Sequence, residues 1–278
     1  MDPLPPPRDG ILWNVTGDLR MLLLLPASFL LQVADPAIAA GVDRHSVFRT
    51  DPWGRGVRSV ESVQRWVYGG ADAAAEGRRL RRLHRDIHGT APDGTPYRAL
   101  DPDTWAWVHA SGFAVQLHAF GLLWPRPLDP AETEALYAEW LRLGRVLGIH
   151  DRDMPPDATA YREHFHHVVT TRLRLTGVAR ELLDTDAALP APDRGPRPLR
   201  IALRLLWPLL RRPFLRLRAF LTVGYLPPEA RTALGLPWTP GRQRRLRLFS
   251  RAVGVLVALL PDRLRYLPLA RRARAAAP

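Results

Sequence analysis

Histidines are the residues of this chain whose type and spacing most directly suggest chemistry, because its 278 residues include nine histidines and no cysteine. His84 and His88 are four residues apart, so on a helix both imidazoles project from the same face. Such a pair can hold a metal ion, place one imidazole on a haem iron, or lie on the surface as a polar pair. The spacing alone leaves all three interpretations open.

The other histidines favour less specific interpretations. His109 and His118 are nine residues apart in a second predicted helix. His118 lies between Leu117 and Ala119, which is typical of a packing histidine. The three histidines within residues 164–167 are typical of a solvated helix face.

Arginines form a second group with chemical potential. Arg55 and Arg58 are three residues apart, so they share one face of a predicted helix, with Ser59 beside them. An arginine that becomes buried needs an anionic partner. The propionates of a haem would meet this need, and so would Asp35 or Glu61 of the chain itself. A solvated basic face is the remaining interpretation.

The composition narrows the choice of chemistry. The 40 Lys+Arg residues are all arginines, against 27 acidic residues, and the formal charge is +13. The absence of cysteine excludes a disulfide framework, a thiolate nucleophile and an iron–sulfur cluster, and the absence of lysine excludes a Schiff base and a Walker-type phosphate loop. No nucleic-acid-binding motif accompanies the arginines, so we expect no nucleic-acid partner. An anionic membrane surface or an acidic cofactor is at least as good a match for the charge.

Periodic apolar positions and capping residues predict an all-α fold. The predicted helices span residues 21–31, 53–68, 71–88, 103–123, 131–147, 158–183, 199–223 and 241–260, and Pro208 and Pro213 interrupt the seventh. Residues 89–100 form a turn-rich loop, and strand signals are nearly absent.

We expect one large helical domain at residues 11–185, a proline-rich linker at 186–198, and a basic helical C-terminal part at 199–278 that packs on the same domain and ends in a frayed tail. The acidic, proline-rich N-terminus is unlike the basic start of a signal peptide. The apolar run at 21–34 is shorter than the roughly 20 residues of a membrane span. The sequence therefore favours a cytoplasmic protein whose basic 199–218 block suits contact with a membrane surface.

Several ordered motifs resemble one known family. They are GDLRMLLLLPASFLLQVADPAIAAGVDRHSVFRTDPWGRGVRSV at 17–60, LRRLHRDIHG at 80–89 and GTPYRALDPDTWAWVHAS at 94–111. Over most of the chain the sequence resembles the catalytic domain of the MpaB-type and rubber oxygenases, which include the latex-clearing proteins, and its basic end is similar to the short bacterial members. The resemblance implies a single helical domain around a haem b pocket, with a helix-borne histidine as the iron ligand.

The resemblance also implies roles for individual residues. The stretch Leu80–His84 matches the helix that carries the axial ligand, so His84 is the expected iron ligand, with His88 on the same predicted face. Arg55 is expected to anchor or orient the haem. The second recurrent histidine of the family falls on His109.

Three further positions match the family's site but differ in residue type. Arg58 and Ser59 are expected to approach the distal or propionate region, where rubber-cleaving members have lysine and threonine. Asp35 stands where close relatives commonly have histidine before proline. We expect Asp35 or Ser59 to orient a proton or the oxygen. One apolar helix and three aromatic residues would line the pocket: residues 21–31, Trp105, Trp107 and Phe113.

The resemblance thus implies a haem-b-dependent oxygenase that acts with O₂ on a small apolar substrate, such as an unsaturated or isoprenoid-like molecule. Three alternatives stay open. The first is a non-catalytic haem-binding protein. The second is a non-haem metal enzyme that uses His84, His88 and His109 with a carboxylate such as Asp35 or Glu139. The third is a membrane-surface or nucleic-acid binder that uses the 199–218 block.

Overall fold

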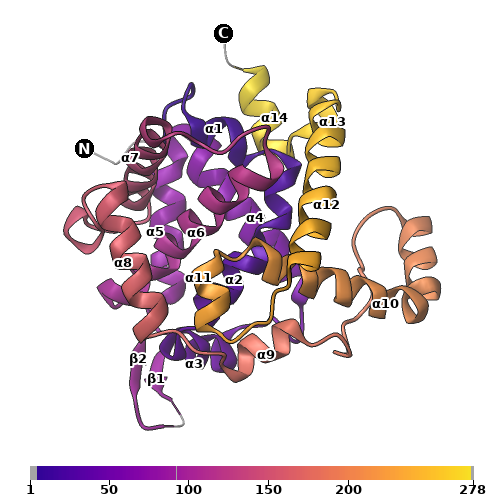
Figure 1. The fold of residues 1–278 in the computed structure, drawn as a ribbon, viewed down its shortest axis with the longest axis horizontal. Coiled ribbons are helices and arrows are strands. Elements are labelled where there is room, and N and C mark those ends of the chain that lie inside the picture. Colours follow the sequence, from indigo (N-terminus) through magenta and orange to yellow (C-terminus); the bar gives the residue numbers. More distant parts are fainter. Residues whose placement is uncertain (1–4, 92, 277–278) are drawn as a thin grey trace.

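Helices make up most of the molecule, as predicted. The computed structural model describes residues 5–91 and 93–276. In this part of the chain the only sheet is a hairpin of two antiparallel strands, β1 (His88–Thr90) and β2 (Pro96–Arg98), with Gly89 opposite Tyr97. Figure 1 shows the hairpin extending from one end of the helical body.

The N-terminal two thirds of the chain supply most of this body. Its elements are α1 (Ile11–Thr16), the 3₁₀ helix η1 (Leu19–Leu23), α2 (Leu25–Val33), α3 (Pro36–His45), α4 (Pro52–Tyr68), η2 (Gly70–Asp72), α5 (Ala73–His84), α6 (Pro102–Leu123), α7 (Pro130–Val146), η3 (Asp151–Asp153), α8 (Ala158–Thr171) and α9 (Gly177–Leu183). The remaining elements are α10 (Arg197–Tyr225), α11 (Pro228–Ala233), α12 (Pro240–Ala258), α13 (Asp262–Arg265) and α14 (Pro268–Ala275).

Aspartate–proline pairs begin three of the helices that matter most here. Asp35, Asp51 and Asp129 each accept a backbone N–H of the first turn of α3, α4 and α7, and a proline follows each of them. A proline at this position costs no backbone hydrogen bond, because the first N–H groups of a helix have no partner within the helix. The starts of α4 and α7 agree with the sequence prediction, whereas no helix was predicted at the position of α3.

The core is built around α6, which contacts α2, α7, α8, α10 and α12. Its Phe113 side chain is fully buried and packs edge-on against the rings of Tyr137, Trp140 and Tyr161. Because α6 is buried along most of its length, the helices packed around it are positioned by contacts with its side chains (Figure 1).

Three predicted elements differ in the structure. The helix predicted at 71–88 ends at His84, where the backbone turns into the hairpin and the Ala99 N–H donates to the Ile87 carbonyl. The helix predicted at 158–183 is divided into α8 and α9, because the Arg174 N–H donates to the Ala34 carbonyl of another segment and Thr176 caps a new helix. The 199–223 block is one helix, α10, with both prolines inside it.

The C-terminal tail does not fray as predicted; it is fastened to the start of the chain. The Leu267 N–H donates to the Gly17 carbonyl at 2.8 Å, and the N–H groups of Leu269 and Ala270 are directed at the Gln64 side chain of α4. The fit is close, because a Cβ at Gly17 would lie 2.1 Å from the Ala270 Cβ. The tail is therefore part of the core that supports α4.

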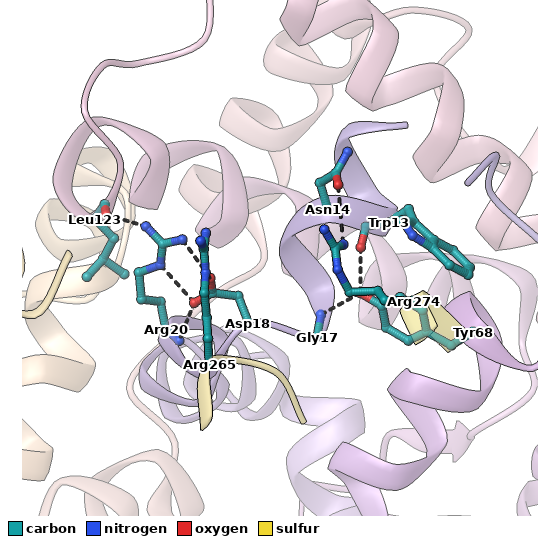
Figure 2. Close-up of polar contacts among 9 residues, drawn as sticks. All are labelled: Trp13, Asn14, Gly17, Asp18, Arg20, Tyr68, Leu123, Arg265 and Arg274. Atoms are coloured by element: carbon teal, nitrogen blue, oxygen red, sulfur yellow. Dashed lines mark hydrogen bonds and ion pairs between the residues drawn. The ribbon is translucent and has the colours of Figure 1, made fainter. Parts of the chain in front are cut away.

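A buried charge cluster completes this attachment (Figure 2). The Asp18 carboxylate, fully buried, accepts hydrogen bonds from the guanidinium groups of Arg20 and Arg265 at 2.6–2.9 Å. Arg20 also donates to the Leu123 carbonyl at the end of α6. Beside the cluster, the Tyr68 hydroxyl of α4 donates to the Trp13 carbonyl. The Asp18 carboxylate thus binds the C-terminal tail directly through Arg265 and is linked to α6 through Arg20.

No single helix in the described residues is both long enough and apolar enough to cross a membrane. One sharply bent pair, Leu19–Val33 with Pro36–His45, meets the length and composition criteria together, with a bend of 109°.

Candidate functional site

His84 and Arg55 lie on the neighbouring helices α5 and α4, near enough for the charge of Arg55 to act on the His84 imidazole. His84 is the last residue of α5 and is half-buried, with its ring edge-on to the Trp105 ring of α6 at 5.2 Å between centroids. Arg55 is in the first turns of α4, and its positive charge acts on the His84 imidazole. The predicted axial ligand and the predicted haem-anchoring arginine are thus on two helices that pack against each other.

The two nitrogens of His84 have different environments. Nδ1 lies 2.8 Å from the Leu80 carbonyl one turn earlier. A carbonyl can only accept, so Nδ1 carries the proton and the neutral ring has its lone pair on Nε2. Burial lowers the pKa of His84, and the charges of Arg55 and Arg79 lower it further. No described residue forms a hydrogen bond with Nε2, so this nitrogen can coordinate a metal.

Arg55 has no acidic partner among the described residues. Its guanidinium stacks on the Phe29 ring of α2, with 3.9 Å between Cζ and the ring centroid. Burial lowers the pKa of Arg55 to about 10, and the charge of Arg58 adds to this. A half-buried, unpaired guanidinium is costly unless an anion accompanies it. Arg55 is therefore the strongest candidate in this region for binding an anionic group.

Two contacts hold α5, and with it His84, in place. Glu76 is buried and accepts hydrogen bonds at 2.7 Å from Ser62 of α4 and from Arg79. On the other side, Gly77 lies so close to α7 that a Cβ would be 1.9 Å from the Val146 carbonyl oxygen. The position of His84 is thus set by both neighbouring helices.

Arg58 and Ser59, predicted to approach the cofactor, form hydrogen bonds with α4 itself or with its capping residue. Arg58 is exposed and donates to Asp51, the capping residue of α4, at 2.9 Å. The Ser59 hydroxyl donates to the Arg55 carbonyl at 3.0 Å. Ser59 thereby contacts the backbone of Arg55, whereas Arg58 faces solvent.

Asp35 is buried and has a complete set of partners. One carboxylate oxygen caps α3 through the N–H groups of Ala37 and Ile38, and the other forms an ion pair with Arg172 at the end of α8. Arg172 in turn lies over the Trp107 ring. Asp35 therefore connects α3 to α8.

The prediction that His84 and His88 share a helix face is wrong. The helix ends at His84, and His88 is an exposed residue of β1, opposite Arg98. The four-residue spacing places two side chains on one face only while the helix continues, and here the chain turns into a hairpin.

His109 is buried away from His84, against α7. Its Nε2 lies 2.8 Å from the Trp140 carbonyl, its ring stacks on the Trp140 indole, and the indole N–H donates to the His109 carbonyl. Burial lowers the pKa of His109 to about 4, so the ring is neutral. Glu139, on the same helix as Trp140, accepts the N–H groups of Ile11 and Leu12 at the start of α1.

Among residues 5–91 and 93–276, no three histidine or carboxylate side chains lie close enough together to form a metal-binding group. The structure thus does not assemble the histidine–carboxylate set considered from the sequence. Of the aromatic residues predicted to line a pocket, Trp105 contacts His84, whereas Trp107 and Phe113 are buried in the core. Phe29 lies in the 21–31 segment that was predicted to line the pocket, but its contact with Arg55 was not predicted.

Comparisons with known proteins show which family the chain belongs to. Residues 13–265 match the family model described as "ER-bound oxygenase mpaB/B'/Rubber oxygenase, catalytic domain". The chain is also similar to uncharacterized proteins of Mycobacterium bovis and Mycobacterium tuberculosis, each 28% identical over 258 residues, which is 87% of this chain and 91% of each relative. No solved structure gave a significant match. Since the family match covers most of the chain, including Arg55 and His84, the protein belongs to the mpaB/rubber oxygenase catalytic-domain family.

Proposed function

We propose that this protein is a haem-b-dependent oxygenase that acts with O₂ on an apolar substrate such as an unsaturated or isoprenoid-like molecule. Membership of an oxygenase family supports the reaction class. One observation carries the cofactor assignment: two neighbouring helices carry a half-buried neutral histidine whose Nε2 has no hydrogen-bond partner, and a half-buried arginine with no acidic partner, among the described residues.

His84 fits the role of axial ligand. An imidazole that ligates a metal usually donates its other N–H to a carbonyl or carboxylate, which fixes the tautomer and the ring orientation. In His84 the Leu80 carbonyl does this. The lowered pKa keeps the ring neutral at pH 7, which is the form that binds iron. Trp105 restricts the ring from the side of α6.

Arg55 fits the role of an anion-binding residue for a haem propionate. A guanidinium forms charge-assisted, often bidentate hydrogen bonds with carboxylates. The guanidinium stacks on the Phe29 ring, and the Ser59 hydroxyl donates a hydrogen bond to the Arg55 carbonyl. We therefore assign Ser59 to positioning Arg55 and Asp35 to joining α3 with α8.

When bound, haem b would supply an iron with an open coordination position for O₂, and this chemistry belongs to the cofactor. The chain would hold the iron through His84, bind the propionate side through Arg55 and keep water from the ring with Phe29 and Trp105. These aromatic neighbours also favour an apolar substrate over a charged one. The same contacts would be expected in a non-catalytic haem-binding protein, so turnover decides between the two functions.

The reaction is tested by isotope labelling. Haem-loaded protein incubated under ¹⁸O₂ with apolar alkenes, squalene among them, is expected to yield products that carry ¹⁸O, as mass spectrometry would show. Protein incubated with the same substrates without O₂ should form none. A stable haem complex that produces no labelled product from any alkene would contradict the oxygenase proposal and favour the non-catalytic alternative.

Replacing Arg55 by alanine is expected to weaken haem binding about 10- to 100-fold, because hydrogen bonds to a charged group contribute roughly 1.5–3 kcal/mol. Arg55→Lys should recover part of the loss. A haem titration followed at the Soret band measures the affinity.

The matched control is Arg82→Ala, which removes the same charge from an exposed position two residues before His84. If Arg82→Ala weakened haem binding as much as Arg55→Ala, net charge would explain the effect, and the specific role of Arg55 would be lost.

A further inference from the structure

The first part of α10 is a helical arm that lies largely outside the body of the protein. We call residues 197–213 the α10 arm. Figure 1 shows α10 extending from the other helices and changing direction along its length, and Pro208 and Pro213 lie inside it. Prolines within a helix remove a backbone hydrogen bond and kink the axis.

The main attachment of the α10 arm to the body is Trp207. Trp207 is its only buried side chain, and the indole N–H donates to the Leu189 carbonyl at 2.7 Å. The Trp207 ring also packs against Trp53 of α4 and against Phe214. The anchor holds the arm in a defined orientation and leaves its other faces to solvent.

Large apolar side chains cover the outer face of α10. Leu199, Leu206, Leu210 and Leu217 follow one another at intervals of seven, four and seven residues, which places them on one face of the helix. Together with Ile201, Leu205 and Leu209, they are 43–76% exposed. A contiguous apolar surface of this kind is unusual on a soluble monomer and marks a contact surface.

The charged side chains of α10 are all positive. Residues 197–225 contain seven arginines and no acidic residue. Arg204 and Arg216 of α10 are exposed and form no ion pair with any residue the structure describes, whereas Arg212 pairs with Asp186. The surface therefore combines leucines with uncompensated positive charge.

This combination selects one kind of partner. A helix with leucines on one face and arginines on the other lies in the interface of an anionic bilayer, where the guanidinium groups reach the phosphates. A second copy of the chain that docked through α10 would bring its seven arginines against the first seven. Nucleic acid would satisfy the arginines but would leave the leucines in water.

We propose that the α10 arm docks this protein on the surface of an anionic membrane, with the leucine face inserted at the level of the headgroups. Binding should require both an anionic lipid and the leucines. It should occur with or without haem, because the arm contains none of the residues assigned to the cofactor.

Vesicle sedimentation of the full-length protein tests the lipid requirement. We expect binding to vesicles of phosphatidylcholine with 30% phosphatidylglycerol, and little binding to phosphatidylcholine alone. Leu206→Gln/Leu210→Gln should reduce the binding at least about tenfold, because two inserted apolar side chains are lost. The control Leu83→Gln/Leu264→Gln removes two exposed leucines from α5 and α13 and should bind like the unmodified protein.

A fluorescent label tests the insertion. Because the chain has no cysteine, Leu210→Cys provides a single thiol for an environment-sensitive dye such as NBD. The emission should shift to the blue on anionic vesicles, and the same dye at Leu83→Cys should not shift. Unchanged thermal unfolding of each variant would establish that the fold is intact.

Three results would overturn the proposal. The first is no binding to the anionic vesicles. The second is binding that persists in Leu206→Gln/Leu210→Gln without a shift at position 210, which would mean adsorption by charge alone. The third is concentration-dependent self-association through the arm in place of vesicle binding, detected by sedimentation velocity.

Discussion

Replacing His84 by alanine is expected to remove haem binding at micromolar concentrations, with a loss in affinity of more than about 100-fold. Loss of a residue that merely orients a metal ligand costs about 10- to 100-fold, and loss of the ligand itself should cost more. The variant should retain no Soret band once haem has been added and the unbound haem removed by gel filtration, although its circular dichroism stays helical, because His84 is only half-buried at the end of α5. Added imidazole should restore part of the band by filling the space left by the side chain.

Two histidine variants serve as controls for this result. His88→Ala changes an exposed residue of the hairpin, four positions from His84. His118→Ala changes a half-buried histidine of α6 that lies near Arg231 of α11. Both variants should bind haem like the unmodified protein. Equal haem content in His84→Ala and the two controls would contradict the ligand assignment.

The second large effect is expected at the charge cluster of Figure 2, which lies outside the proposed haem site. Asp18→Asn should destabilise the fold by about 3–5 kcal/mol, because removing one member of a buried ion pair leaves the others uncompensated. Here the neutral amide would face both Arg20 and Arg265. The free energy of unfolding of a native protein is about 5–15 kcal/mol, so this loss should be evident in urea unfolding.

The Asp18 effect also depends on pH. Burial alone would raise the pKa of Asp18, but hydrogen bonds from Arg20 and Arg265 outweigh burial and lower the pKa below 3.8. The stabilisation is therefore present above the unfolded-state pKa and is lost as the pH falls through the lower folded-state value. Asp18→Asn should lack this part of the acid sensitivity.

Asp43→Asn is the matched control, because Asp43 pairs with Arg49 on the surface. Exposed ion pairs contribute about 0–1 kcal/mol. If Asp18→Asn and Asp43→Asn unfolded at the same urea concentration, the cluster would have no special role in joining the tail to the core.

The sequence predicted the elements whose signals are local. Asp51 followed by proline indicated the start of α4, and Asp129 followed by proline indicated α7, because capping depends on residues within one turn. Helix ends were predicted less well where they depend on contacts with distant parts of the chain. The end of α5 at His84 depends on the pairing of β1 with β2, and the break between α8 and α9 depends on the Ala34 carbonyl.

The site was predictable in part, for the same reason. The resemblance to the family indicated His84 and Arg55, which lie on the neighbouring helices α5 and α4. It could not indicate the contact of Arg55 with Phe29, nor the ion pair of Arg172 with Asp35, because each depends on how two different helices pack. The Asp18 cluster was missed, since its partner Arg265 is 247 residues away.

The central claim is that His84 and Arg55 bind haem b, and one measurement tests it most directly. The purified protein is examined by ultraviolet–visible spectroscopy before and after reduction with dithionite, with iron and protein determined on the same sample. We predict a Soret band that shifts on reduction, with one iron per chain, in the protein as isolated or after addition of haem. A protein fraction without a Soret band after addition of haem and removal of the unbound haem, or iron bound without that band, would contradict the proposal.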